Sequence, residues 1–91
     1  MGATNFVEVM EGYDSPREAY DEAVKDAIYC YGHDPYSGTI ATTSGFEYLG
    51  EIPEEDVQDF IENHTDDYDK WDKCGCIKSE DKYIFFGWVA I

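Results

Sequence analysis

The chain is poor in basic residues. Its 91 residues include 21 Asp and Glu but only six Lys and Arg, which leaves a formal net charge of −15. Self-repulsion from roughly one uncompensated negative charge per six residues opposes compaction, so selection for stability does not explain it. The charge argues against nucleic acid and anionic membrane surfaces as direct partners. It favours a basic protein surface.

Cysteine is scarce, and long apolar runs are absent from the sequence. Three cysteines (Cys30, Cys74 and Cys76) are an odd number, which does not predict a disulfide framework and favours a reducing compartment. The opening MGATNFVEVMEG has neither the basic region nor the apolar run of a signal peptide. No segment approaches the roughly 20 apolar residues of a membrane span. We therefore predict a cytoplasmic protein with no membrane partner.

Aromatic residues, in contrast, are plentiful. Two Trp, eight Tyr and five Phe supply a large apolar area for a chain of this length. A chain of 91 residues has room for one core and not for two. We predict a single domain over residues 1–91.

Two helices are predicted from capping signals and apolar spacing. Ser15-Pro16-Arg17-Glu18 is a capping box with proline at the first helical position. Apolar residues recur at helical spacing as far as Tyr31, and Gly32 follows as the expected residue past the end. A second helix is predicted to open at Pro53, with acidic residues in its first turn. Its buried stripe would be Val57, Phe60, Ile61 and His64.

Four strands are predicted from short apolar or β-branched runs. They are Phe6–Met10, Thr39–Thr43, Cys74–Lys78 and Tyr83–Ile91, and the residues Phe46, Tyr48 and Leu49 either extend the second strand or anchor a loop. The last run is apolar on both faces, so it should be central in a sheet or covered by a helix. Residues 79–82 would form a four-residue hairpin loop. The order β-α-β-α-β-β predicts an α+β fold, a short mixed or antiparallel sheet with two helices packed on it.

The stretch from Gly32 to Thr43 holds the most varied set of polar side chains. A small, nucleotide-like ligand could bind there, with His33, Tyr36, Thr39 and Thr42 as the contacting residues. Backbone geometry is the alternative explanation, because glycine ends a helix and Asp-Pro starts a turn. The stretch lacks the lysine of a phosphate-binding loop and precedes a strand. No nucleophile and base are placed together by spacing, so we predict no enzyme activity and no catalytic residue.

The Cys74-Gly75-Cys76 segment is a weak candidate for a zinc site. Two residues apart on a strand, both thiols should face the same side. His64 or Cys30 would have to complete the ligand set. Structural zinc sites normally use a wider spacing than C-x-C, so we predict buried thiols, no metal and no cofactor.

Acidic residues are concentrated between Glu51 and Asp72, where there are ten acids and one base, Lys70. A solvated helix face usually mixes charges of both signs. If the segment were helical, with a rise of about 1.5 Å per residue, it would carry one carboxylate per roughly 3.3 Å, close to the spacing of about 3.4 Å between phosphates along one DNA strand. The predicted partner-binding residues are Glu51, Glu54, Glu55, Asp56, Asp59, Glu62, Asp66, Asp67 and Asp69. Asp21, Glu22 and Asp26 could extend the same surface.

Residues 31–43, YGHDPYSGTIATT, together with Phe85-Phe86-Gly87-Trp88, resemble a family of small uncharacterised proteins of phages and other mobile elements. The resemblance covers about half of the chain and implies no catalytic residues. In size and charge the chain is also similar to phage-encoded anti-CRISPR and anti-restriction inhibitors, several of which imitate DNA.

Charge and resemblance together predict a non-enzymatic inhibitor or decoy that binds a basic, nucleic-acid-binding host protein in the host cytoplasm. Exposed tyrosines such as Tyr13, Tyr36 and Tyr68 would supply anchor contacts. The alternative is a protein that binds or sequesters a nucleotide-like ligand through Gly32–Thr43.

Overall fold

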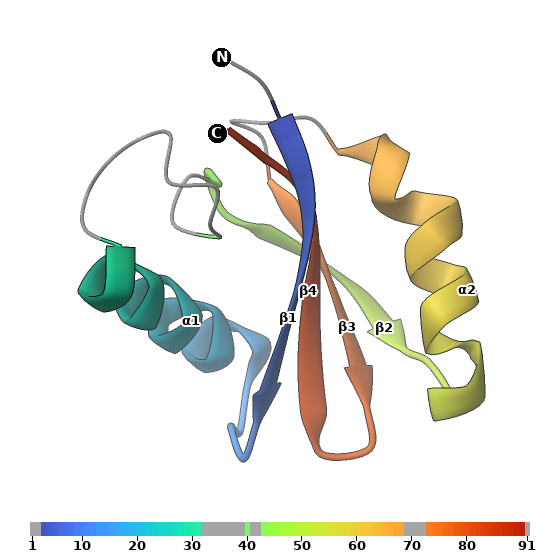
Figure 1. The fold of residues 1–91 in the computed structure, drawn as a ribbon. Helices are drawn as coiled ribbons and strands as arrows, with labels where there is room; N and C mark the ends of the chain where they lie inside the picture. The colour runs from blue at the N-terminus through green and yellow to red at the C-terminus, as the bar shows by residue number, and fades with distance from the viewer. Residues whose placement is uncertain (1–2, 32–39, 41–42, 69–72, 91) are drawn as a thin grey trace.

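The computed structural model describes residues 3–31, 40, 43–68 and 73–90 of the chain (Figure 1). In chain order its elements are β1 (Ala3–Glu11), α1 (Pro16–Tyr31), β2 (Phe46–Glu51), α2 (Glu54–His64), the short 3-10 helix η2 (Thr65–Asp67), β3 (Cys74–Ser79) and β4 (Lys82–Ala90). The predicted α+β class and the predicted order of helices and strands are confirmed.

The four strands form one mixed sheet in the order β1-β4-β3-β2. β4 pairs antiparallel with β1 on one side and with β3 on the other, while β3 and β2 run parallel. The prediction that the last strand is central in a sheet or covered by a helix is confirmed, because β4 lies between β1 and β3. The hairpin between β3 and β4 is tighter than predicted, because Ser79 and Lys82 are paired and only Glu80 and Asp81 form the turn.

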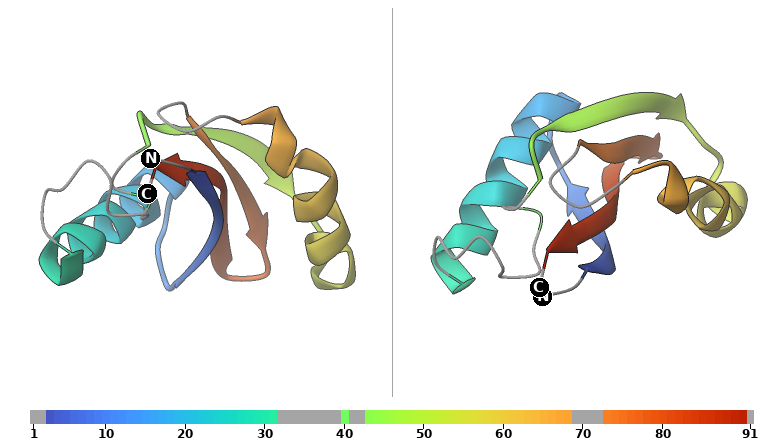
Figure 2. Two further views of the ribbon diagram at one scale, coloured as in Figure 1. Left: turned by 45° about the horizontal axis from the view of Figure 1, so that its top comes forward. Right: turned by 90° about the horizontal axis from the view of Figure 1, so that it is seen from above.

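The two helices lie on opposite faces of the sheet (Figure 2). The strand period of two places alternate residues of β4 on opposite faces. Tyr83 and Phe85 accordingly pack with the α1 side of the core. Ile84 and Phe86 pack with the α2 side. Both faces of β4 are covered, which explains why its sequence is apolar throughout.

Helix α1 occupies the predicted range because both of its ends carry clear signals. The Ser15 side chain accepts a hydrogen bond from the Glu18 backbone N–H at 3.2 Å, as a capping box requires. Ala19 and Ala23 are buried against the sheet, and the absence of larger side chains there lets the helix approach closely.

Helix α2 begins after Pro53 and presents its predicted stripe to the sheet. Val57, Phe60 and Ile61 pack against the buried residues of the α2 face. His64, the last residue of the stripe, stacks on the Phe60 ring with centroids 4.0 Å apart. Its Nδ1 lies 2.8 Å from the Phe60 carbonyl oxygen, so that nitrogen donates to the carbonyl.

The predicted position of the second strand, Thr39–Thr43, is wrong. β2 lies later, at Phe46–Glu51, and includes Phe46, Tyr48 and Leu49. The Thr43 backbone N–H donates to the Ile40 carbonyl at 3.0 Å, a local turn contact, and Thr39, Ala41 and Thr42 lie outside the described residues. Ile40 is buried in the α1 side of the core, so its apolar character reflects packing outside a strand.

Candidate partner-binding surface

Eight of the nine predicted partner-binding acids lie among the described residues, and all eight are exposed. Five of them belong to α2, two to η2, and Glu51 ends β2. Asp69 lies outside the described residues. The structure therefore gathers one continuous run of the chain, from Glu51 to Asp67, on the α2 side of the sheet.

The amphipathic pattern of α2 forces its acids outward. The helix buries its apolar stripe against the sheet, so that Glu54, Glu55, Asp56, Asp59 and Glu62 remain in water. Its eleven residues contain no lysine or arginine. At about 1.5 Å per residue the helix is about 16 Å long, which is roughly one carboxylate per 3.3 Å. α2 by itself therefore has the density of negative charge that the sequence predicted for the whole segment from Glu51 to Asp72.

The acids of α1 do not extend this surface. Asp21 and Asp26 are exposed and Glu22 is half-buried, but α1 packs on the opposite face of the sheet. Asp21 also forms an ion pair with Arg17, with an N–O distance of 3.3 Å. The suggestion that the two helices form a single acidic surface is wrong, because each covers its own face. Among the described residues, the acids of α1 and those of α2 therefore lie on opposite sides of the sheet.

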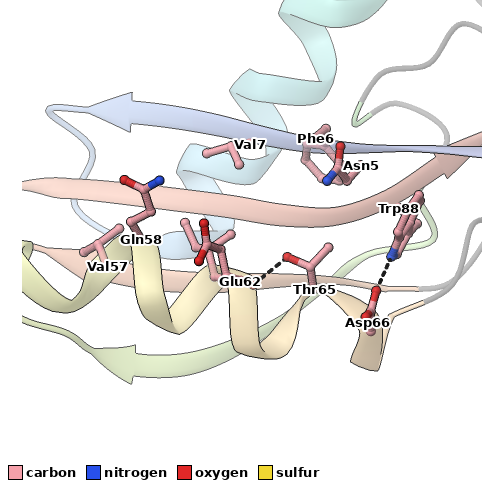
Figure 3. A pocket seen from close by; sticks show the side chains of 10 residues that line it. Asn5, Phe6, Val7, Val57, Gln58, Glu62, Thr65, Asp66 and Trp88 are labelled. Carbon is pink, nitrogen blue, oxygen red and sulfur yellow. Dashed lines mark hydrogen bonds between the residues drawn. The ribbon is translucent and has the colours of Figure 1, made fainter.

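A groove lies beside α2 on the same face of the sheet, between α2 and β1 (Figure 3). Its volume is about 500 Å³. Its lining includes Val7 and Trp88 from the sheet and Val57, Ile61, Glu62 and Asp66 from α2 and η2. We call it the α2–β1 groove.

The groove exists because α2 covers only part of its face. On β1, Phe6 and Met10 point into the α1 side of the core. Val7 and Val9 alternate with them onto the α2 face, where α2 does not reach them, and they are 55% and 48% exposed. Alternation along a strand predicts that Val7 and Val9 share a face, but nothing in the sequence indicates that this face is open.

One end of the groove is held by contacts from η2. The Trp88 indole N–H donates to Asp66 Oδ1 at 3.3 Å. Thr65 is buried, and its hydroxyl donates to the Ile61 carbonyl. The contact between Trp88 and Asp66 joins β4 to η2 at this end of the groove. The Asp66 carboxylate therefore lies next to the apolar ring of Trp88.

The structure describes two of the three predicted anchor tyrosines, Tyr13 and Tyr68, and neither side chain is exposed. Tyr68 is 8% exposed, and its hydroxyl donates to Glu47 Oε1 at 3.0 Å, so its description as an exposed anchor is wrong. Burial raises its pKa well above the ordinary value, and the hydrogen bond to Glu47 adds to the effect. Tyr13 is half-buried against the core. Tyr29, which sequence reasoning did not single out, is 91% exposed on α1.

A smaller cavity of about 270 Å³ lies beside Tyr68. Glu47, His64, Asp67 and Lys73 contribute to its lining. The Tyr68 hydroxyl already donates to Glu47, so it is not placed to act on a ligand in this cavity. We assign the Tyr68–Glu47 contact a structural role, because it joins the η2 side of the chain to β2.

The two thiols of the Cys74-Gly75-Cys76 segment face the same side of the sheet, as predicted. Both are fully buried on the α1 side, and burial raises the pKa of each to about 12. Cys30 is exposed on α1 and His64 is on the opposite face. Among the residues that the structure describes, no three His, Cys, Asp or Glu side chains are grouped as metal ligands.

The predicted ligand-binding residues His33, Tyr36, Thr39 and Thr42 all lie outside the described residues. Binding of a nucleotide-like ligand by Gly32–Thr43 therefore stays a prediction from the sequence.

Comparison with protein families, with curated proteins and with solved structures finds no match to this chain. The resemblance to small proteins of mobile elements thus stays a prediction that rests on the sequence motifs. Within the described part of the chain, no helix has the length and apolar character needed to cross a membrane.

Proposed function

We propose that this protein is a non-enzymatic inhibitor or decoy of mobile-element origin. It would bind the basic, nucleic-acid-binding surface of a host defence protein or another DNA-handling protein in the cytoplasm. The observation that carries the proposal is the exposure of all five carboxylates of α2 while the apolar residues of the helix face the sheet. These charges repel one another and bury no surface, and only those in the first turn gain from the helix dipole, so we infer that they serve a partner.

The mechanism follows from the charge density of α2. Carboxylates spaced like the phosphates of one DNA strand would meet lysine and arginine side chains that otherwise hold nucleic acid. Each exposed pair contributes only about 0–1 kcal/mol, so no single acid decides the affinity. Together they create a field that guides a basic partner toward this face and raises the rate of association.

The proposal is tested by two variants of equal net charge. One is E54Q/E55Q/D59N/E62Q on α2, and its control is E18Q/D21N/E22Q/D26N on α1. Each removes four of the 15 net negative charges and leaves −11. Each helix loses first-turn acids that interact with the helix dipole, two in the α2 variant (Glu54 and Glu55) and one in the α1 variant (Glu18), so the stability of each variant is measured beside its rate.

We expect the α2 variant to associate about tenfold more slowly than the parent at low salt with a basic protein captured from a lysate. Its rate should also depend less on ionic strength. The α1 variant should remain closer to the parent. Equal rates for all three proteins at two ionic strengths would show that the α2 acids are only a solvated face.

A further inference from the structure

The α2–β1 groove has no role in the attraction of a basic partner by the acids of α2. Its volume of about 500 Å³ is not filled by any side chain of the described residues. Its walls are apolar where the sheet and α2 meet, at Val7, Ile61 and Trp88. Apolar side chains that remain exposed together beside polar ones are typical of a surface that a partner covers.

The charged residues that line the groove indicate what kind of partner it could bind. Glu62 and Asp66 line it, and none of its described lining residues is lysine or arginine. A second copy of this chain would bring the same carboxylates and a further 15 negative charges against the groove. Self-association is opposed on both counts. A peptide segment with apolar side chains flanked by lysine or arginine would place apolar groups on the walls of the groove and positive charges against Glu62 and Asp66.

The shape of the open strip favours a helix as the occupant. α2 packs over Ile77 of β3 and over Ile84 and Phe86 of β4, which leaves β1, with Val7 and Val9, as the open strand of this face. A second helix packed beside α2 would lie about 8–10 Å from it, or about two strand spacings, which places it over β1. On the opposite face α1 packs against β1 and β4 in a comparable position. A helix in the groove would complete the second face in a similar way.

We propose that the α2–β1 groove docks one amphipathic, basic helix of the partner protein, with its apolar side on Val7, Ile61 and Trp88 and its lysine or arginine side chains against Glu62 and Asp66. This inference rests on the proposed function and makes it more specific. The acids of α2 attract the partner, and the groove supplies the apolar anchor that holds it.

The probe is a synthetic peptide of about 18 residues, or five helical turns, with leucine and lysine at helical spacing. A matched peptide has serine in place of each leucine. Trp71 lies outside the described residues, and the W71F variant leaves Trp88 as the only tryptophan, so its emission reports on the groove. We expect the leucine peptide to bind about tenfold more tightly or better, since each leucine removed from water contributes at least that factor. It alone should shift the Trp88 emission.

Matched variants locate the contact. E62Q/D66N removes two charges that line the groove, and the asparagine retains an acceptor for Trp88. E55Q/D59N removes two exposed charges of α2 that do not line it. Val7→Thr keeps the shape of the side chain, and Tyr29→Ser removes a more exposed aromatic from the other face. We expect E62Q/D66N and Val7→Thr to weaken the leucine peptide roughly threefold or more, and their controls to have smaller effects.

Each other result has a definite meaning. If both peptides bind equally and the variants on α2 weaken both, the acidic surface binds by charge alone and the groove inference is wrong while the proposed function stands. If neither peptide binds at low salt, the acidic surface does not attract basic segments, and the proposed function fails as well. Sedimentation that shows a dimer abolished by Val7→Thr would assign the groove to a second copy and overturn the inference.

Discussion

The Gly75→Ala variant is expected to unfold about 10 °C below the parent protein, because overpacking a core of this size costs about 1–3 kcal/mol. Gly75 on β3 is paired with Phe86 on β4, and both are buried. A Cβ atom at Gly75 would lie 2.5 Å from Cζ of the Phe86 ring. The ring cannot move aside freely, since Phe60 and Tyr68 contact it edge-on with centroids 6.3 and 5.9 Å away.

A double variant identifies the cause of the loss. Gly75 has an ordinary strand backbone, so alanine there introduces no backbone strain. In the F86L background the flat ring is gone, and Gly75→Ala should cost much less than it does in the parent. Urea unfolding of the four proteins gives the coupling energy. A neutral or stabilising effect of Gly75→Ala in the parent would mean that Phe86 does not pack over Gly75.

Stability is expected to fall steeply as the pH rises above 9. Burial raises the pKa of Cys74 and Cys76 from 9.0 to about 12, and it also raises the pKa of Tyr20. Between pH 9 and 12 the unfolded chain loses these protons while the folded chain keeps them. The unfolded state is therefore favoured as the pH rises, and the stabilisation that is complete below pH 9 disappears toward pH 12. Each thiol contributes a slope of at most about 1.4 kcal/mol per pH unit.

The Cys76→Ala variant separates the thiol from every other titrating group. The substitution leaves a small cavity and lowers stability at all pH values. It also removes one thiol that the folded chain keeps protonated while the unfolded chain ionises. Its free energy of unfolding should decline with pH less steeply than that of the parent by up to about 1.4 kcal/mol per unit. Urea midpoints at several pH values between 8 and 11 provide the slopes. Parallel slopes for the two proteins would contradict the burial of a neutral thiol at this position.

The elements with local signals were predictable from the sequence. The capping box at Ser15 marks the start of α1, and the apolar stripe of α2 identifies the side of the helix that is buried. The continuous apolar run of β4 indicated an interior strand because only a strand covered on both faces tolerates it. In each case the pattern that carries the signal lies within the element itself.

The features that depend on distant contacts were not predictable in the same way. β2 is placed by parallel pairing with β3, for example Phe46 with Cys74, and β propensity favoured the threonines at 39–43 instead. Tyr68 is buried because it packs on Phe86 and reaches Glu47. The groove follows from how far α2 extends across the sheet, and nothing near Val7 or Trp88 in the sequence encodes that distance.

The central claim is that this protein occupies a surface that otherwise holds nucleic acid, and a competition measurement tests it most directly. The partner captured on the immobilised protein is titrated with duplex DNA, and a dissociating complex is distinguished from a ternary one by sedimentation. We predict that DNA releases the partner completely and that a higher concentration of the protein reverses the release, with the α2 variant displaced by less DNA than the α1 variant. A stable ternary complex of protein, partner and DNA would contradict the account.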